Sequence, residues 1–261
     1  MSVSLLLIDP QNDFCSPDGT LYVPGAEFDC KRIASFIDAN SDAIDSIHIS
    51  LDTHPFYHIA HPVFWKDKNG NQPAPYTMIS HTNFAAGEYR PMDESLEKRA
   101  EEYLLNLESR GRYTLTVWPP HCLIATPGAC VNKDLWNAAH RWEVAHPGKS
   151  IDYVQKAVNP LTEHYSIVQA EVPDPEDEST RTNFALIDKI KNTRIIVAGE
   201  ALSHCVSNTI RDLCVYLPAA QITLLSDCVS NVTGFEYISQ EFLEEYGAKG
   251  MQTAQSVQLA L

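Results

Sequence analysis

The chain has 261 residues, of which 44% are hydrophobic, and it carries a formal net charge of −15. A chain of this length buries roughly 70–75% of its unfolded surface, which is enough for one three-layer core. Acidic residues outnumber basic ones by 34 to 19. No Lys/Arg cluster interrupts the excess, so we expect no nucleic acid and no anionic membrane as a partner, because both bind concentrated positive charge.

The sequence predicts neither a secretory signal, nor a membrane span, nor a disulfide framework. The first ten residues lack the basic start and the long apolar run of a secretory signal. No apolar run approaches the roughly 20 residues of a membrane span. The seven cysteines are odd in number and form no CxxC pair. These features predict a cytoplasmic protein with free thiols.

Short apolar runs alternate with amphipathic stretches along the whole chain. The runs predict strands at 4–8, 46–51, 113–117, 152–156, 194–198, 221–226 and 251–257, and the stretches predict helices near 28–40, 92–110, 132–145, 180–191, 204–216 and 236–247. Strand–helix alternation with continuous apolar strands is typical of parallel sheets that are covered on both faces. We therefore expect an α/β fold, a three-layer α/β/α sandwich around a mainly parallel, Rossmann-like sheet of about six strands.

We expect one domain over residues 1–261, with an insertion around 62–112 that contains the predicted helix at 92–110. Two stretches predict irregular structure: 62–91, rich in Pro, Gly and Asn, and the acidic 172–180. Both are more typical of loops over a site than of interdomain linkers. The alternative for the acidic stretch is a solvated surface loop.

Residues capable of chemistry follow several of the predicted strands. They are Asp9, Asp52, His121, Lys156 and Cys205. Ligands of parallel sheets bind beyond the carboxyl ends of the strands, so we expect these side chains to converge.

Cys205 stands where a helix is predicted to begin, after the β-branched run at 194–198 and Gly199. The positive end of a helix dipole lowers a thiol pKa and favours the nucleophilic thiolate. The alternative is a small buried cysteine with no chemical role.

If Asp9 and Lys156 lie beside Cys205, the three side chains together can carry out nucleophilic catalysis. Asp9 would accept the thiol proton and return it to a leaving amine, while Lys156 would lower the thiol pKa and orient the carboxylate. Cys205 would attack a carbonyl carbon. The backbone N–H groups of Ala201 and Cys205 would stabilise the oxyanion.

A second cluster has the composition of a metal site. Asp52 and His54 are separated by one residue, and His58, His61 and His121 follow. Side chains two apart on an extended chain lie on the same side. Carboxylate and imidazole ligands suit Zn²⁺, Fe²⁺ or Mn²⁺. The alternative is a set of ordinary surface histidines.

Taken together, these motifs resemble those of the isochorismatase-like cysteine hydrolases, and within them the nicotinamidases. The resemblance rests on Leu7-Ile-Asp-Pro-Gln-Asn-Asp-Phe14, Asp52-Thr-His54, Trp118-Pro-Pro-His-Cys122, Val154-Gln-Lys-Ala-Val-Asn-Pro160 and Gly199-Glu-Ala-Leu-Ser-His-Cys-Val206. These five motifs occur in one order between residue 5 and about residue 227.

The resemblance implies hydrolysis of nicotinamide, or of a similar small amide, to the acid and ammonia through a thioester, and hence a place in NAD salvage. It implies the catalytic residues Asp9, Lys156 and Cys205, and a cis peptide bond between Glu200 and Ala201. It further implies a divalent metal, zinc before iron or manganese. The metal ligands would be Asp52, His54 and His121, with His58 as an additional ligand or a neighbour of the ligands, and the ring-binding aromatics would be Phe14, Trp118 and Tyr165.

Three positions depart from the nicotinamidase pattern: Thr53, Glu200 and Ser203. These departures keep the residues needed for acyl transfer, but the substrate can differ from nicotinamide. One alternative is another hydrolase of the superfamily, acting on an N-carbamoyl, biuret-like or ureido compound. A second is a family member without catalysis that binds or regulates. The insertion is compatible with a homo-oligomer surface.

Overall fold

The computed structural model describes residues 2–259 and 261. Its central sheet has six strands in the order β10-β9-β8-β1-β2-β7, and every neighbouring pair is parallel. The strands are β1 (Val3–Ile8), β2 (Ser46–Asp52), β7 (Asp152–Lys156), β8 (Arg194–Gly199), β9 (Ile222–Leu225) and β10 (Gln252–Ala254). The predicted α/β class and the strand number are confirmed.

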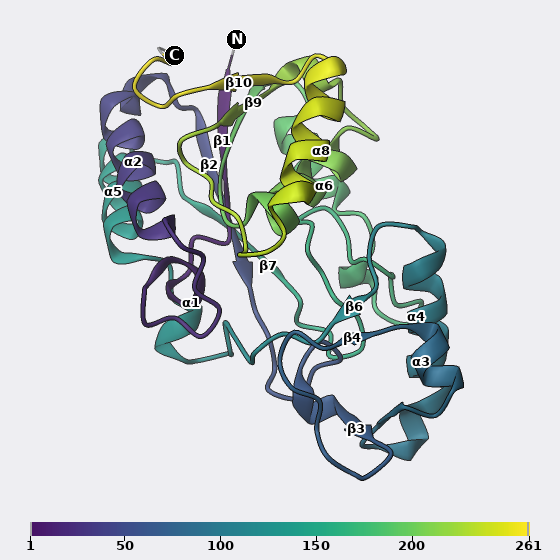
Figure 1. Cartoon of the computed structure of the whole chain (residues 1–261). Coiled ribbons are helices and arrows are strands. Elements are labelled where there is room, and N and C mark those ends of the chain that lie inside the picture. The colour runs from purple at the N-terminus through teal and green to yellow at the C-terminus, as the bar shows by residue number, and fades with distance from the viewer. Residues whose placement is uncertain (1, 260) are drawn as a thin grey trace.

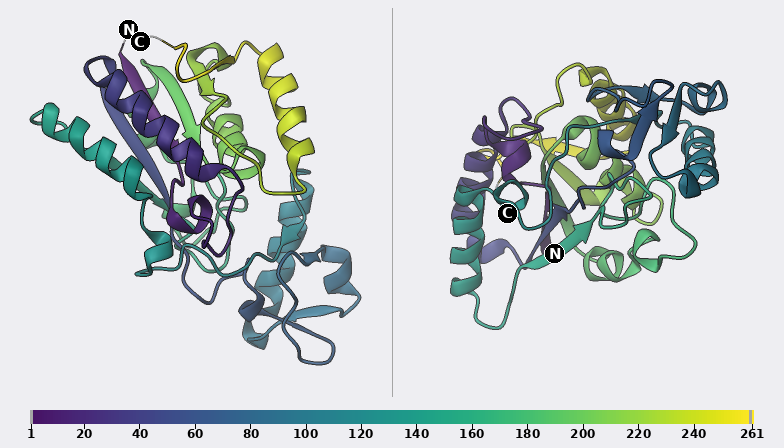
Figure 2. Two further views of the ribbon diagram at one scale, coloured as in Figure 1. Left: turned by 60° about the vertical axis from the view of Figure 1, so that its left-hand side comes forward. Right: turned by 90° about the horizontal axis from the view of Figure 1, so that it is seen from below.

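Helices cover both faces of this sheet (Figures 1 and 2). One face carries α2 (Ala26–Ala39) and α5 (Lys133–Ala145), and the other carries α6 (Phe184–Ile190), α7 (Ser207–Leu213) and α8 (Glu236–Ala248). The two-sided cover explains why β1 is buried at all six positions. The short α1 (Asn12–Cys15) follows β1.

The central strands β1 and β8 lie side by side, and Ile8 pairs with Gly199 at their carboxyl ends. Gly199 has a φ of +111°, and a Cβ there would lie 2.1 Å from the carbonyl oxygen of Ile8. Only glycine fits, because it has no Cβ and tolerates a positive φ. This close approach brings the turn after β8 against the end of β1.

The predicted strand at 113–117 is wrong as a member of the main sheet. Its central part forms β6 (Leu115–Thr116), which pairs antiparallel with β4 (Met78–Ile79) outside the six-stranded sheet. Val117 donates its N–H to Thr77 O at 2.8 Å. The apolar run thus satisfies its backbone on residues 77–79, a pairing that local periodicity does not reveal.

Residues 62–112 form a lobe at the lower right of Figure 1. It contains β3 (Trp65–Asp67), β4, α3 (His81–Ala85), β5 (Tyr89–Pro91) and α4 (Glu97–Ser109), together with the 3₁₀ turns η2 (Pro62–Phe64) and η3 (Glu94–Leu96). Strand β3 pairs antiparallel with β5. The helix predicted at 92–110 is present as η3 and α4.

The acidic stretch 172–180 is anchored to this lobe. Its buried Asp174 forms an ion pair with Arg99 of α4 at 2.5 Å and accepts a hydrogen bond from Asn159 Nδ2 at 3.1 Å. The stretch ends in η5 (Glu178–Thr180), which Asp177 caps through the Ser179 N–H. At least two acidic side chains of this stretch, Asp174 and Asp177, therefore have specific partners.

The remaining 3₁₀ turns are η1 (Ser41–Ala43), η4 (Pro127–Ala129) and η7 (Ala219–Gln221). In the described part of the chain, no helix combines the length and the apolar character that crossing a membrane requires.

Candidate active site and metal centre

Four of the predicted site residues lie at the carboxyl ends of neighbouring strands. Asp9 follows β1, Asp52 and Lys156 end β2 and β7, and Cys205 lies in the turn after β8. Since β8, β1, β2 and β7 are adjacent in the sheet, their ends open on one site, as expected for parallel sheets.

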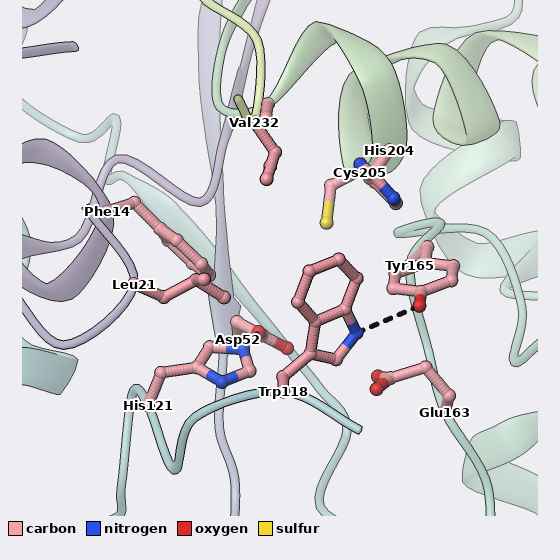
Figure 3. A pocket seen from close by; sticks show the side chains of 11 residues that line it. Phe14, Leu21, Asp52, Trp118, His121, Glu163, Tyr165, His204, Cys205 and Val232 are labelled. Atoms are coloured by element: carbon pink, nitrogen blue, oxygen red, sulfur yellow. Dashed lines mark hydrogen bonds and ion pairs between the residues drawn. The ribbon is translucent and has the colours of Figure 1, made fainter. Parts of the chain in front are cut away.

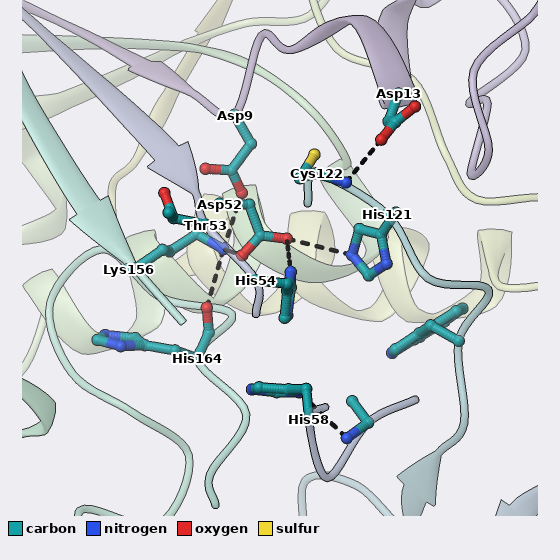
Figure 4. Close-up of polar contacts among 12 residues, drawn as sticks. Asp9, Asp13, Asp52, Thr53, His54, His58, His121, Cys122, Lys156 and His164 are labelled. Carbon is teal, nitrogen blue, oxygen red and sulfur yellow. Dashed lines mark hydrogen bonds and ion pairs between the residues drawn. The ribbon is translucent and has the colours of Figure 1, made fainter. Parts of the chain in front are cut away.

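Lys156 is the centre of the polar contacts in this site (Figure 4). Its buried ammonium group lies 3.0 Å from Asp9 Oδ2 and donates to Asp52 Oδ1 at 2.9 Å. It also donates to the carbonyl oxygen of His164 at 2.8 Å and lies 3.6 Å from Cys205 Sγ. Burial by itself lowers the pKa of Lys156, but the carboxylates of Asp52 and Asp9 outweigh it and raise that pKa well above its usual value. Lys156 is therefore a cation.

Asp9 is fully buried and held in one orientation by Ser50. The Ser50 hydroxyl donates to Asp9 Oδ1 at 2.6 Å and accepts from the Asp9 N–H at 2.9 Å. Burial raises the pKa of the Asp9 carboxyl, and the charge of Lys156 and the Ser50 hydrogen bond oppose this rise. A carboxylate of raised basicity next to a thiol suits a general base.

Cys205 lies in the π-helical turn η6 (Leu202–Val206), which leads into α7. The expectation of a lowered thiol pKa is wrong. Burial raises the pKa of Cys205 well above its ordinary value, and the opposing effect of Lys156 is offset further by Asp9 and Asp52. The Cys205 thiol is therefore neutral at rest and would need a base to act as a nucleophile, and Asp9 is the carboxylate beside it.

The turn before Cys205 contains the cis peptide bond between Glu200 and Ala201 that the resemblance implies. Ala201 O accepts from His204 N at 3.0 Å and from Val206 N at 3.1 Å. Ala201 and Cys205 both line the cavity described below. Their backbone N–H groups remain the predicted oxyanion donors.

Two of the departures from the family pattern have structural partners in the loop after β9. Glu200 is buried, its Oε2 accepts from Ser230 N at 3.1 Å, and burial raises its pKa well above the ordinary value. Ser203 Oγ accepts from Val232 N at 3.2 Å. Both side chains thus hold the turn that contains Cys205 against residues 230–232.

An aromatic cavity lies in front of the Cys205 thiol (Figure 3). Trp118 donates its Nε1–H to Tyr165 OH at 3.0 Å, which fixes both rings. The lining includes all three predicted aromatics, Phe14, Trp118 and Tyr165, and also Leu21, Asp52, His121, Glu163, Ala201, His204, Cys205 and Val232.

The predicted metal ligands lie at one side of this cavity. Asp52 Oδ2 is 3.2 Å from His121 Nε2 and 3.4 Å from His54 Nδ1. His54, His61 and His121 offer nitrogen atoms within 4.8 Å of one another, and all three are buried. A second group with the same spread consists of His54, His58 and Glu163.

The donor set fits a divalent transition metal. Both ring nitrogens of His54 and the Nε2 of His61 are buried without hydrogen-bond partners among the described residues. Burial lowers the pKa of His54 and of His61 to about 3, so both imidazoles are neutral and keep a lone pair. Buried polar atoms are costly unless they are satisfied, which a bound ion would achieve.

Sequence reasoning missed four residues around the cavity: Leu21, Glu163, His204 and Val232. Glu163 stands two residues before Tyr165 and His204 directly before Cys205, but neither stands in a recognisable spacing. His204 stacks on Tyr113 with ring centroids 5.8 Å apart, and burial lowers its pKa to about 4.

Comparisons with known proteins agree with this picture. No family model matches the chain. The nicotinamidase of Saccharomyces cerevisiae is 25% identical over 209 residues, covering 79% of this chain and 78% of that protein. The solved yeast nicotinamidase Pnc1p superposes with a TM-score of 0.67 at 20% identity, over 97% of this chain and 99% of the other.

A second solved structure, the pyrazinamidase of Pyrococcus horikoshii in complex with zinc, superposes with a TM-score of 0.60 at 21% identity. It matches 98% of this chain and 99% of the other. The lobe at 62–112 falls within these matches, since they extend over nearly the whole chain.

Proposed function

We propose that this chain, a relative of the nicotinamidases in sequence and in fold, hydrolyses nicotinamide or a similar small amide to the carboxylic acid and ammonia. The identification as an isochorismatase-like hydrolase of C–N bonds, made from the motifs, is confirmed by the comparisons. One observation carries the specific reaction: the buried contact of Asp9, Lys156 and Cys205 at the wall of an aromatic cavity.

The acylation step uses the thiol and the carboxylate together. Cys205 Sγ attacks the amide carbonyl carbon as its proton passes to Asp9. The carbonyl oxygen takes the negative charge and accepts hydrogen bonds from the N–H groups of Ala201 and Cys205. When the C–N bond breaks, Asp9 returns the proton to nitrogen, so that ammonia leaves and a thioester remains.

Deacylation reverses the roles with water. Asp9 removes a proton from a water molecule that attacks the thioester carbonyl, and the proton returns to the Cys205 sulfur as the acid leaves. Lys156 stays charged throughout and keeps Asp9 ionised between the two steps, since its ammonium lies 3.0 Å from the carboxylate.

The aromatic side chains of the cavity suit a flat substrate. We propose that Phe14, Trp118 and Tyr165 contact the ring, whose burial supplies affinity. We propose that Asp52, His54 and His121 hold a divalent metal, zinc before iron or manganese, and the zinc complex of the similar pyrazinamidase supports this proposal. The ion would act as a Lewis acid that binds and orients a ring nitrogen.

Replacing His54 or His121 by alanine is expected to remove most of the bound metal, because each substitution deletes one of a few ligands. Elemental analysis of the purified variants after dialysis checks this. His140→Ala is the matched control, since that side chain is half exposed on α5 and lies outside the cluster. Metal content equal to that of the unchanged protein in both ligand variants would show that these residues are not ligands.

The pH dependence of kcat/KM is expected to report on Asp9. The base must be ionised, and its folded pKa is raised above 3.8 by burial, so activity should fall with decreasing pH before an ordinary carboxyl would protonate. The titratable groups around it are Lys156, Asp52 and the Cys205 thiol.

Ser50→Ala sharpens this test. The variant removes a hydrogen bond that lowers the pKa of Asp9, so the acidic limb of kcat/KM should move to higher pH. The pH profile of nicotinamide hydrolysis measures the shift. A limb that moves to lower pH, or stays in place, would contradict Asp9 as the titrating base.

The substrate is tested by ammonia release from nicotinamide with protein whose bound metal has been quantified. Turnover supports the proposal. A folded, metal-loaded protein without turnover would refute nicotinamide as the substrate, and N-carbamoyl, biuret-like and ureido compounds would then be assayed.

We further propose that residues 1–261 form one hydrolase domain in which 62–112 is an insertion. The proposed location is the cytoplasm, where thiols stay reduced, because all seven cysteines are free.

A further inference from the structure

We propose that His61 is a fourth protein ligand of the metal, alongside Asp52, His54 and His121, and that His58 is instead the hydrogen-bond donor that positions Glu163. This inference extends the metal site of the proposed function. It concerns the ion alone and does not depend on which amide the enzyme hydrolyses.

The distinction between the two histidines rests on their hydrogen bonds. A neutral imidazole carries a proton on one ring nitrogen and a lone pair on the other. The partner of one nitrogen therefore decides whether the other can bind a metal. A carbonyl acceptor on Nδ1 leaves the lone pair on Nε2, whereas an N–H donor on Nδ1 requires the proton on Nε2.

His61 has the ligand arrangement. Its Nδ1 lies 3.2 Å from the carbonyl oxygen of Phe56, which can only accept, so Nδ1 carries the proton. Its Nε2 keeps a lone pair and is buried without a partner among the described residues. His121 repeats this arrangement, with Nδ1 at 2.8 Å from Pro119 O and Nε2 facing Asp52.

His58 has the opposite arrangement. The backbone N–H of Ala60 donates to its Nδ1 at 3.1 Å, as the lowest dashed line in Figure 4 shows. The lone pair of Nδ1 is therefore in use and Nε2 carries the proton, so neither nitrogen can bind a metal. The Nε2–H has no partner in the described part of the chain.

Glu163 supplies the acceptor that this proton needs. Its Oε2 is buried and also without a partner among the described residues, and the group His54, His58 and Glu163 lies within 4.8 Å. Glu163 Oε1 accepts from the backbone N–H of His164 at 2.9 Å and lies 3.6 Å from His54 Nε2. The three side chains lie within 4.8 Å of one another without a hydrogen bond between them in this structure. We assign them as a network in which the Nε2–H of His58 donates to Glu163, and not as a second metal site.

The segment that carries both histidines is held by backbone hydrogen bonds. Ile59 N donates to Pro160 O at 2.8 Å, and Ala60 O accepts from Trp118 N at 2.7 Å. His61 N donates to His58 O at 2.9 Å, which closes a tight turn. The His61 imidazole lies in the group with His54 and His121, and the His58 imidazole lies in the group with His54 and Glu163. A ligand on such a restrained backbone is preorganised for the ion.

The first experiment counts imidazoles on the metal in the unchanged protein. The protein is loaded with Zn²⁺ or Co²⁺ and studied by X-ray absorption, and the proposal requires three imidazoles. A count of two, or an ion that does not bind at all, would overturn it. The number of imidazoles bound to the metal is measured without turnover. Protein that is inactive on nicotinamide but binds its metal through three imidazoles would therefore refute the proposed substrate and not this inference.

Two variants assign the third imidazole. His61→Phe keeps a ring of similar volume, and we expect the count to fall to two and the metal affinity, measured by competition with a chromophoric chelator, to fall by about 10–100-fold or more. His58→Asn is the matched control, because its Oδ1 can accept the Ala60 N–H. We expect it to keep three imidazoles. A drop in the count for His58→Asn, or an unchanged count for His61→Phe, would contradict the assignment.

Discussion

Replacing Cys205 by alanine is expected to abolish amide hydrolysis, with kcat reduced by about 10⁴- to 10⁶-fold, as when other covalent nucleophiles are removed. The loss follows because, among the described residues, no other side chain at the wall of the cavity offers a nucleophile that Lys156 and Asp9 contact. Alanine removes only the sulfur, so folding and metal content should persist. Ammonia release, elemental analysis and thermal unfolding measure the three properties.

Cys130→Ala is the matched control for this experiment. Cys130 is an exposed thiol that does not line the cavity, and its loss should leave turnover unchanged. Equal residual activity of Cys205→Ala and Cys130→Ala on the native substrate would rule out Cys205 as the nucleophile.

Replacing Lys156 by methionine is expected to damage both catalysis and stability. The variant leaves Asp9 and Asp52 buried without the cation that contacts both. Breaking a buried ion pair by removing one partner typically costs about 3–5 kcal/mol in the free energy of unfolding. Turnover should fall by about 10²- to 10⁴-fold, because Asp9 would then bind its proton too tightly to act as a base. Urea unfolding and ammonia release measure the two losses.

The double variant Asp9→Asn/Lys156→Met separates these effects. Removing the carboxylate together with the ammonium should restore part of the stability, because one uncompensated charge disappears. Catalysis should not return, since the base is gone. A Lys156→Met protein as stable as the unchanged one would contradict the electrostatic account of this site.

Asp52 connects the two halves of the site. Its Oδ1 accepts from Lys156 and its Oδ2 faces His121 and His54. Burial raises the pKa of Asp52, but the charge of the Lys156 ammonium is among the effects that outweigh burial and hold this pKa well below the usual value. One carboxylate thus contacts both the Lys156 ammonium, proposed to be catalytic, and the proposed metal ligands.

Local sequence determined the elements that position the chemistry. The runs at 4–8 and 194–198 are nearly continuously apolar, as expected of central strands buried on both faces. The runs at 46–51 and 152–156 mix apolar and polar residues, and 152–156 forms the edge strand β7. Asp9, Asp52 and Lys156 stand at the ends of their runs, and Cys205 lies in the turn after its run. Asp9, Asp52, Lys156 and Cys205 could therefore be singled out before the sheet order was known.

Periodicity could not place the run at 113–117, because it describes a residue's neighbours in sequence and not its pairing partner. That run pairs with residues 78–79 in the lobe. The lobe itself consists largely of short strands and turns, whose pairing is set by long-range hydrogen bonds.

The properties of the reacting groups were decided by tertiary structure alone. The position of Cys205 before a helix predicted a lowered thiol pKa, yet burial beside Asp9 and Asp52 raises it. The sequence alone does not distinguish His58 from His61 as ligands. In the structure, a backbone N–H donates to Nδ1 of His58, whereas Nδ1 of His61 faces a carbonyl oxygen, so the two rings carry their protons on different nitrogens. Burial and hydrogen-bond partners set proton affinity, and both arise only when distant segments pack together.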